Sequence, residues 1–389
     1  MDSYPRLNLM GAAQPVVSGD QAGDQTHPSI AQLCERYDAM CRARAIYYPV
    51  AFQFMRLLGK GRQGRVFLGM RQGARGCVTE HAIKVFDPSL YVSPEEYWTD
   101  MGRIASQISR LQRMQSPYLV RRSTYDETNG IGYVQMEAID GLDLRQLLLP
   151  SHLPLARKCC TVNEWNYFQE TIFRRKRDRL ALQPGIVVYI LRSCLKGLES
   201  IHSMNFLHSD VKPGNIMIDR LGTVKLVDFG RAVVMGERQG FLLGSPMYMA
   251  PELHRREVGT AQSDVYSLGI VAVEMLSGEP IAPESATEET LLHIKMALPG
   301  QLQCLLPPAV VENKELMLIL QKLIAPDTAM RYATAKEAEV GNAGLRIVDK
   351  QLVRAGLDTE YARDLADYIR KLADDGTGRI EVPREADDT

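Results

Sequence analysis

The run from Leu58 to Gly69, "LGKGRQGRVFLG", constrains the fold of this chain more than any other feature. Its glycines at 59, 61 and 64 have a spacing found both in dinucleotide-binding turns and in plain hairpins. A dinucleotide-binding turn lies between a strand and a helix. Here the residues after the last glycine, "RVFLGM", have the composition of a strand. The order favours a glycine-rich hairpin whose backbone N–H groups can approach phosphate.

The hydrophobic pattern along the 389 residues separates a β-rich first part from a larger helical part. It predicts the following elements: strands over 51–58, 65–71 and 77–86, a helix over 94–114, and β-rich sequence over 120–137. After Gly141 the pattern is mostly helical. This order predicts an α+β fold with an N-lobe over 51–137, a C-lobe over 138–340 and a cleft between them.

Both ends of the chain extend beyond these lobes. Residues 1–50 would form an extension, with a polar, mobile arm to about residue 28 and then a helix from Ile30 to about Ala45. Residues 341–389 carry apolar side chains at helical spacing. Two interpretations of this tail stay open: helices that pack back on the main domain, or a module that docks a partner.

The overall composition argues against several classes of function. The net charge of −1 favours neither nucleic acid nor a membrane surface as partner. The longest apolar runs are too short to span a bilayer. The seven cysteines form no C-x-x-C pair, which argues against a zinc site and indicates reduced thiols. We therefore expect a cytoplasmic protein.

Lys84 lies in the short β-rich run "HAIKVF", between two apolar neighbours. A lysine on a strand is usually solvated. This one follows the last glycine of the hairpin by twenty residues. That position would place its amino group under the glycine loop, within reach of phosphate oxygens.

Two further motifs, "HSDVKPGNIMID" starting at His208 and "VKLVDFG" ending at Gly230, complete a family pattern. With the glycine loop, Lys84 and "MAPE" at 249–252, the chain resembles the eukaryotic-type (Hanks-type) serine/threonine protein kinases over about residues 52–340. "SDVYSLG" at 263–269 and Arg331 follow in the family's order. The resemblance implies a two-lobed kinase fold, ATP and Mg²⁺ as cofactors, and protein substrates.

The resemblance assigns a role to each polar residue that matches one of these motifs. Asp210 would orient the attacking hydroxyl, Lys212 would neutralise the transferring phosphoryl group, and Lys84 would hold the α- and β-phosphates. Asn215 and Asp228 would bind Mg²⁺, which prefers hard oxygen ligands. A lysine two residues after the aspartate is typical of serine/threonine kinases rather than tyrosine kinases.

The resemblance also outlines an ATP pocket. Met136 would be the gatekeeper, residues 137–139 the hinge that binds adenine, Asp143 the ribose contact, and Met217 the floor beneath the base. The full set of expected nucleotide contacts is Leu58, Gly59, Lys60, Gly61, Gly64, Val66, Ala82, Lys84, Met136, Glu137, Ala138, Ile139, Asp143 and Met217.

Other matches imply structural contacts. Glu252 and Arg331 should form a buried ion pair, and Asp264 should hydrogen-bond the backbone of the catalytic loop. Ser245 should bond near Asp210 and Lys212. A stack between the lobes would consist of Leu111, His208 and Phe229.

Two departures from the family pattern leave alternatives open. The helix glutamate that pairs with the strand lysine is replaced by Gln107, counted back from "SPYLV", unless Glu96 or Asp100 takes its place. Because a neutral partner bonds a lysine more weakly than a carboxylate does, a weakly active or inactive kinase-like scaffold is the alternative function. An insertion over 149–183 would be a solvated helix and loop, or a docking surface for an acidic substrate or partner.

The third departure concerns control of activity. Ser209 stands where many kinases have an arginine that an activation-segment phosphate neutralises. From Phe229 to Gly244 the segment has no Ser, Thr or Tyr. We therefore expect a non-RD kinase whose segment is ordered by Phe241, Leu242 and Leu243 and needs no phosphorylation. A small-molecule phosphotransferase of this fold is a further alternative, against which "GSPMYMAPE", resembling a peptide-docking loop, argues.

Overall fold

The computed structural model describes residues 28–46, 51–61, 63–175, 179–228, 232–237, 245–354 and 360–373. Most of the predicted N-terminal arm therefore lies outside the described residues, as do Phe229 and the segment from Phe241 to Leu243. The chain forms two compact units. We call them the sheet unit (residues 1–110 and 122–138) and the helical unit (residues 111–121 and 139–389).

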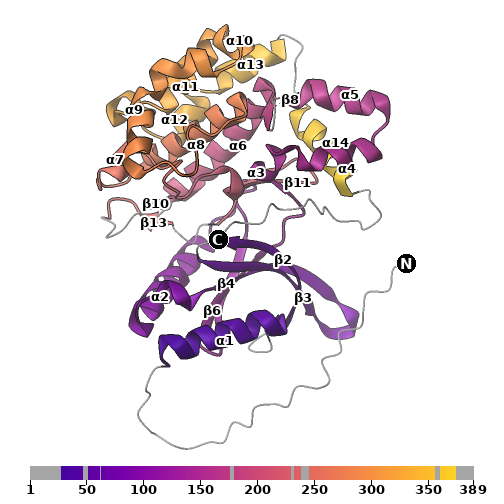
Figure 1. The fold of residues 1–389 in the computed structure, drawn as a ribbon, viewed down its shortest axis with the longest axis vertical. Helices are drawn as coiled ribbons and strands as arrows, with labels where there is room; N and C mark the ends of the chain where they lie inside the picture. The colour runs from indigo at the N-terminus through magenta and orange to yellow at the C-terminus, as the bar shows by residue number, and fades with distance from the viewer. Residues whose placement is uncertain are drawn as a thin grey trace, which may run out of the picture. The chain divides into compact units, whose positions relative to one another are not determined.

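The sheet unit is built on an antiparallel sheet, in which the described residues form six strands in the order β1-β2-β3-β4-β6-β5 (Figure 1). The strands are β1 (Ala45–Ile46), β2 (Phe52–Gly61), β3 (Gly64–Gln72), β4 (Val78–Phe86), β5 (Arg122–Thr128) and β6 (Ile131–Glu137). A short 3₁₀ turn, η1 (Ala74–Gly76), joins β3 to β4, and another, η2 (Pro88–Leu90), follows β4. The strands predicted from the sequence are confirmed, although β2 continues to the glycine loop.

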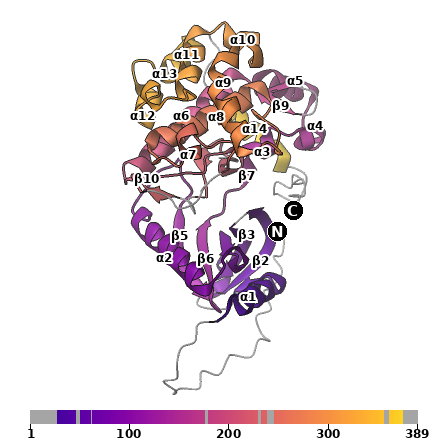
Figure 2. The same ribbon diagram turned by 60° about the vertical axis from the view of Figure 1, so that its left-hand side comes forward.

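Two helices accompany this sheet. Helix α1 (Ile30–Ala43) starts at a capping box formed by Ser29 and Gln32, and it buries Leu33, Tyr37 and Met40 as the sequence predicted. It packs against β1, β6 and η2 (Figure 2). Helix α2 (Pro94–Leu111) is tied to β6 where the Tyr97 hydroxyl accepts a hydrogen bond from the Gly132 N–H at 2.8 Å.

The helical unit is organised around two buried helices, α6 (Pro184–His202) and α8 (Ala261–Ser277). Every residue of α8 from Ser263 onward is buried, so this helix forms the centre of the unit. The other α-helices are α3 (Leu144–Leu147), α4 (Leu153–Cys159), α5 (Val162–Thr171), α7 (Pro251–His254), α9 (Glu288–Leu305), α10 (Pro308–Val311), α11 (Lys314–Leu323), α12 (Ala335–Val340), α13 (Arg346–Arg354) and α14 (Tyr361–Ala373).

Short strands of the helical unit carry its loops. Strands β7 (Gly141–Asp143), β11 (Ile216–Asp219) and β12 (Val224–Leu226) form a small sheet in the order β12-β11-β7. Strand β10 (Phe206–Leu207) pairs with β13 (Val233–Val234), and β8 (Phe173–Arg175) pairs with β9 (Leu180–Leu182). The described residues of the unit also include the 3₁₀ turns η3 (Pro150–His152), η4 (Pro213–Asn215) and η6 (Thr328–Met330).

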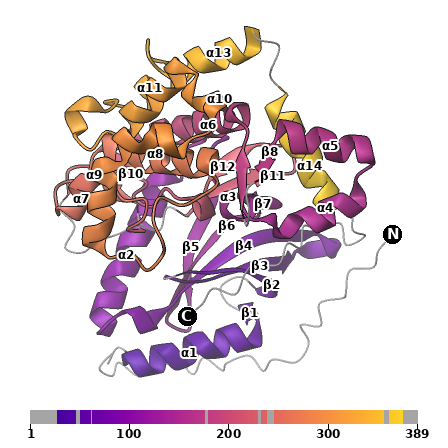
Figure 3. The same cartoon turned by 45° about the horizontal axis from the view of Figure 1, so that its top comes forward.

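The insertion over 149–183 is folded rather than a solvated helix and loop. It contains η3, α4, α5 and the β8–β9 hairpin, and the three residues of β9 are buried. The expectation of a solvated helix agrees with much of α5, where Val162 and Tyr167 are exposed, but it was wrong for Phe168 and Phe173, because these side chains have a partner in the C-terminal tail. Figure 3 shows α14 of the tail beside α4 and α5, and residue contacts confirm the packing.

The contacts between insertion and tail form an aromatic cluster that consists of His152, Phe168, Phe173 and Tyr368. The buried His152 Nε2 faces the Leu147 carbonyl at 3.1 Å, so this nitrogen carries the proton and Nδ1 accepts from the Tyr368 hydroxyl. Burial lowers the pKa of His152 to about 4. The tail interpretation in which helices pack back on the main domain is thus confirmed for α13, which contacts α6, and for α14.

Candidate active site

The glycine run forms the predicted hairpin between β2 and β3. Gly59 pairs with Val66, Lys60 with Arg65 and Gly61 with Gly64. Gly64 has φ +139°, and a Cβ there would lie 1.9 Å from the Val85 carbonyl oxygen, so its glycine is required by the sheet itself. A Cβ at Gly61 would meet nothing within 4 Å, which leaves space next to the hairpin backbone.

Lys84 on β4 lies beneath this hairpin, as the sequence predicted. Its side chain is buried, and its Nζ donates a hydrogen bond to Oε1 of Gln63, the turn residue, at 2.8 Å. The same nitrogen lies 5.6 Å from the centre of the Phe86 ring. The hairpin and the lysine are therefore joined within the sheet unit.

The expected nucleotide residues of the sheet unit lie on neighbouring strands. Val66 is opposite Lys84, and Ala82 is opposite Met136. Residues directly opposite each other in an antiparallel sheet point to the same face, and so do residues two apart on one strand. These four side chains therefore share one face, at the end of β6 that leads through Glu137 to Ala138.

Helix α2 carries the position predicted to face Lys84. Gln107 is buried in this helix. Of the two acidic alternatives, Asp100 accepts from the Tyr91 hydroxyl at 2.7 Å and from Arg103 Nε at 2.8 Å. Glu96 accepts from the Val92 backbone N–H at 3.0 Å. Both acids are thus engaged at the start of the helix, which supports Gln107 as the matching position.

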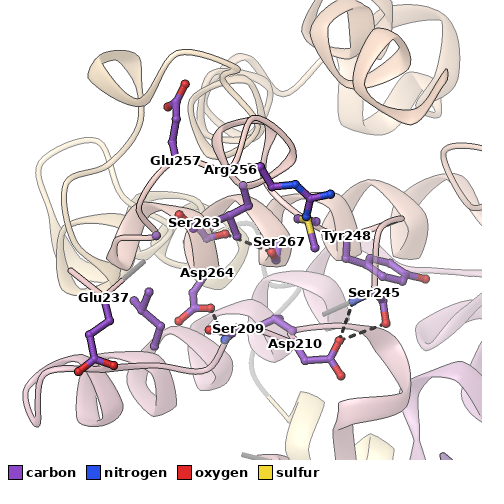
Figure 4. A pocket seen from close by; sticks show the side chains of 15 residues that line it. Ser209, Asp210, Glu237, Ser245, Tyr248, Arg256, Glu257, Ser263, Asp264 and Ser267 are labelled. Carbon is purple, nitrogen blue, oxygen red and sulfur yellow. Dashed lines mark hydrogen bonds between the residues drawn. The ribbon is translucent and has the colours of Figure 1, made fainter. Parts of the chain in front are cut away.

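In the helical unit, Asp210 lies in a group of polar side chains around the catalytic loop (Figure 4). Its Oδ1 accepts from the backbone N–H of Ser245 at 3.0 Å and from the Ser245 hydroxyl at 3.1 Å. Lys212 Nζ lies 3.0 Å from Asp210 Oδ2 and donates to the Ser245 hydroxyl at 3.1 Å. Asn215 Nδ2 donates to Asp210 Oδ2 at 3.1 Å and to its carbonyl at 2.8 Å. The expected contact of Ser245 with Asp210 and Lys212 is confirmed.

The backbone of the catalytic loop is fixed by Asp264 of α8, as predicted. Asp264 accepts from the N–H groups of His208 and Ser209 at 2.8 and 2.9 Å, and it pairs with His202 Nε2 at 2.9 Å. Burial alone would raise the pKa of Asp264, but the bond and charge of His202 hold that pKa below its usual value. Ser209 has φ +64° and Asp228 φ +59°, a strained backbone conformation typical of functional loops.

His208 is fully buried beside these acids. Burial lowers its pKa, while the charges of Asp264, Asp210 and Asp228 act in the opposite direction. Leu111 is also buried, but Phe229 lies outside the described residues, so the expected stack of three stays a prediction. The predicted ion pair of Glu252 and Arg331 is confirmed as a bidentate contact, with both N–O distances 2.8 Å.

The remaining nucleotide candidates of the helical unit lie on the β7–β11 pair, where Asp143 is opposite Met217. Asp143 caps α3, because its Oδ1 accepts from the Gln146 N–H at 2.8 Å. The ribose contact expected of Asp143 stays a prediction, as does the adenine contact of Ile139 next to β7.

Sequence analysis missed two charged residues that hold the loop after Ser245. Glu274 of α8 accepts from the Tyr248 hydroxyl and from Arg179 of the insertion, each at 2.8 Å. Lys295 of α9 is wholly buried beneath the same loop. Both stand in apolar runs, "VAVEML" and "LLHIKMAL", and a charged residue in such a run was the signal that could have drawn attention to them.

Comparison with known families assigns the chain to a class. The model of the family "Protein kinase domain" matches residues 52–339, so the chain belongs to the protein kinase family. The kinase domain of Mycobacterium tuberculosis PknI has the same fold, with a TM-score of 0.52 and 21% identity over 76% of this chain and 95% of that one.

The curated relatives that the chain resembles include serine/threonine-protein kinases. The chain is 28% identical to the serine/threonine-protein kinase PrkC of Bacillus subtilis over 74% of its length, and 27% identical to a probable serine/threonine-protein kinase PknB of Lactococcus lactis over 61%. It spans 39% and 34% of those relatives. Among the helices of the described ranges, none has the length and hydropathy that a bilayer crossing requires.

Proposed function

We propose that this protein transfers the γ-phosphoryl group of ATP to serine or threonine hydroxyls of protein substrates. The observation that carries the proposal is that Lys212, Asn215 and Ser245 all contact the carboxylate of Asp210. In this group Asp210 would accept a hydroxyl proton, and Lys212 would supply a positive charge beside it, which is what phosphoryl transfer requires of a protein.

The residues present also fit Mg²⁺-ATP. Asn215 uses its amide nitrogen toward Asp210, which leaves its amide oxygen as a ligand, and Asp228 offers a carboxylate. Bound Mg²⁺ would neutralise phosphate charge. In the sheet unit, Lys84 and the glycine hairpin provide the ammonium and the open backbone that phosphates bind. Val66, Ala82 and Met136 would contact the base.

One incubation tests this function. The purified protein and its Asp210→Asn variant receive radiolabelled ATP, Mg²⁺ and a generic protein substrate, and phosphoamino acids are then identified. We expect labelled phosphoserine or phosphothreonine from the wild type and a rate lower by about 10²–10⁴ for the variant. Equal turnover of the two proteins would exclude the proposed catalytic aspartate.

The alternative, a weakly active or inactive kinase-like scaffold, rests on Gln107. A glutamine in α2 offers no negative charge to a lysine, and charge-assisted bonds are about twice as strong as neutral ones. The two functions separate when nucleotide binding and transfer are measured side by side. A scaffold would bind ATP in a titration and yet transfer no phosphate in the same buffer.

We further propose that activity does not depend on phosphorylation of the activation segment. Ser209 offers no positive charge for a phosphate to neutralise, and the sequence from Phe229 to Gly244 has no hydroxyl side chain. Complete dephosphorylation, verified by mass spectrometry, should leave the initial rate on a protein substrate unchanged. A large loss that autophosphorylation between Asp228 and Glu252 restores would refute this proposal.

The proposals on location and partners rest on the free cysteines and on the packing of the insertion against the tail. All seven cysteines are free thiols, which supports a reducing compartment, and we propose the cytoplasm. Protein substrates are the expected partners, with no role for nucleic acid. A docking partner at the insertion or the tail would have to bind their outer surfaces, because their facing sides bury each other.

A further inference from the structure

Lys295 is the most completely buried basic side chain near the loop that follows Ser245. This loop, residues 245–252, we call the docking loop. Lys295 belongs to α9 and has no exposed surface. Its Nζ donates to the carbonyl of Pro246 at 2.5 Å, to the carbonyl of Met249 at 2.7 Å and to His254 Nε2 at 2.8 Å. Three donors thus meet three acceptors, the condition under which a buried ammonium is tolerated.

The contact with His254 extends to the surface. Because an ammonium can only donate, His254 Nε2 must accept, and the proton of the neutral ring is on Nδ1. Nδ1 lies 3.2 Å from Glu288 Oε1, to which it donates. Glu288 is partly exposed at the start of α9, and its other oxygen lies 3.6 Å from Arg256. His254 thus links Lys295 to Glu288, a residue of the same helix, α9.

Of the two carbonyls that Lys295 binds, one belongs to Pro246, the first residue of the turn at 246–248, and the other to Met249, directly after it. The residue before this turn, Ser245, bonds Asp210 and Lys212, and the Tyr248 hydroxyl bonds Glu274. A pocket in the helical unit is lined by Asp210, Ser245, Tyr248 and Met249 among others (Figure 4). The backbone that Lys295 fixes is therefore one wall of the pocket that contains the proposed catalytic aspartate.

We propose that Lys295 is a positioning residue for the protein substrate, which holds the docking loop in the conformation that receives the substrate chain beside Asp210. The inference rests on the proposed kinase function. Lys295 does not touch the reacting atoms, and its effect passes through the carbonyls of Pro246 and Met249. It should therefore govern the binding of the protein substrate rather than that of ATP.

The charge of Lys295 gives a second way to examine this role. Burial lowers its pKa to about 7, partly offset by the charges of Glu288 and Glu252. The groups that face it are His254, Glu288 with Arg256, and Glu252 with Arg331. As pH rises through about 7, the ammonium loses a proton, and its two remaining N–H bonds to the carbonyls of Pro246 and Met249 weaken because they are no longer charge-assisted. His254 must then donate from Nε2, and its bond to Glu288 is lost.

The test compares Lys295→Met with Lys322→Met, a matched removal of a lysine that pairs with Glu337 on the surface. We expect Lys295→Met to raise KM for the protein substrate about tenfold or more while KM for ATP stays within about twofold. Lys322→Met should leave both constants unchanged. An unchanged KM for the protein substrate in Lys295→Met would overturn the proposal.

A readout without catalysis separates this inference from the proposed function. The amides of Tyr248 and Met249 both donate to the Ser245 carbonyl, at 3.0 and 3.2 Å, so their hydrogen exchange reports the turn. Exchange should accelerate at both amides in Lys295→Met and not in Lys322→Met. Unchanged exchange would overturn the inference, whereas a wild type that transfers no phosphate would contradict only the proposed function.

If Lys295→Met does not fold, the unmodified protein decides the matter through its pH profile. Here kcat/KM for the protein substrate should fall as pH rises through about 7, and Lys295→Arg, which stays charged, should remove that fall. ATP hydrolysis without protein substrate should not show it. A profile that is identical in the wild type and Lys295→Arg would refute the role of Lys295.

Discussion

The two units hold their proposed catalytic lysines in different ways. In the sheet unit, Lys84 contacts the neutral amide of Gln63, which belongs to the glycine hairpin. In the helical unit, Lys212 contacts a carboxylate and a hydroxyl, which in turn bond each other. An amide is a weaker partner for an ammonium than a phosphate is, so a nucleotide can replace Gln63 at Lys84. The group around Asp210 is instead held together by hydrogen bonds among its own side chains.

The largest effect on rate is expected when Lys84 and Gln63 are mutated one at a time and the two variants are compared. Lys84→Met removes the ammonium and should lower the initial rate by at least about 10²-fold. Gln63→Ala removes only a partner that ATP would replace, and should change the rate less than about threefold. Rates are measured at saturating protein substrate, with circular dichroism to verify folding. If Gln63→Ala loses as much activity as Lys84→Met, the amide is part of the catalytic arrangement and the contrast between the units fails.

Ser245 tests the helical side of the comparison. Ser245→Ala removes the hydroxyl that bonds Asp210 and Lys212, and should lower kcat about tenfold because both groups lose a partner. Ser245→Thr keeps the hydroxyl and serves as the control, with activity close to wild type. A Ser245→Ala enzyme with normal kcat would indicate that Lys212 and Asn215 suffice to place Asp210.

A smaller effect is expected at Gln107 of α2. If Gln107 faces Lys84, Gln107→Glu should preserve or raise the rate, while Gln107→Ala should lower it a few-fold. Initial rates at limiting ATP give the comparison. Our register for this helix is wrong if both changes are silent and Glu96→Gln or Asp100→Asn inactivates the enzyme.

A change that is absent at neutral pH concerns the stability of the helical unit in acid. The pKa of His152 is about 4 in the folded protein against 6.5 as its ordinary value. Below 6.5 the unfolded chain therefore binds a proton that the folded chain does not, and stability falls as pH drops from 6.5 to 4. The loss should approach about 3 kcal/mol.

Unfolding in denaturant at pH 7 and pH 4.5, monitored by tryptophan fluorescence and by amide hydrogen exchange, measures this loss of stability. His152→Phe should flatten the pH dependence because the ring keeps its aromatic packing without a titrating nitrogen. His293→Gln, on the exposed side of α9, is the control and should keep the wild-type dependence. A pH dependence that survives in His152→Phe would assign it to other groups.

Local patterns predicted much of this molecule because their physical cause is local. The glycine spacing followed by a strand predicted the hairpin over Lys84, and the helical pattern from Ile30 to about Ala45 predicted α1. Local patterns could not predict that part of the insertion is buried, because His152 contacts Tyr368, which lies 216 residues further along the chain. The same limit hid Lys295 and Glu274, whose partners come from the docking loop rather than from their own helices.

The aromatic contact between insertion and tail has a consequence for how this protein can vary. The family match ends at residue 339, yet Phe168 and Phe173 are covered by Tyr368. A chain that loses only the tail would present these rings to water, and one that loses only the insertion would do the same to Tyr368. Insertion and tail should therefore be gained, lost and exchanged among relatives as one heritable unit, although more than 150 residues separate them in the sequence.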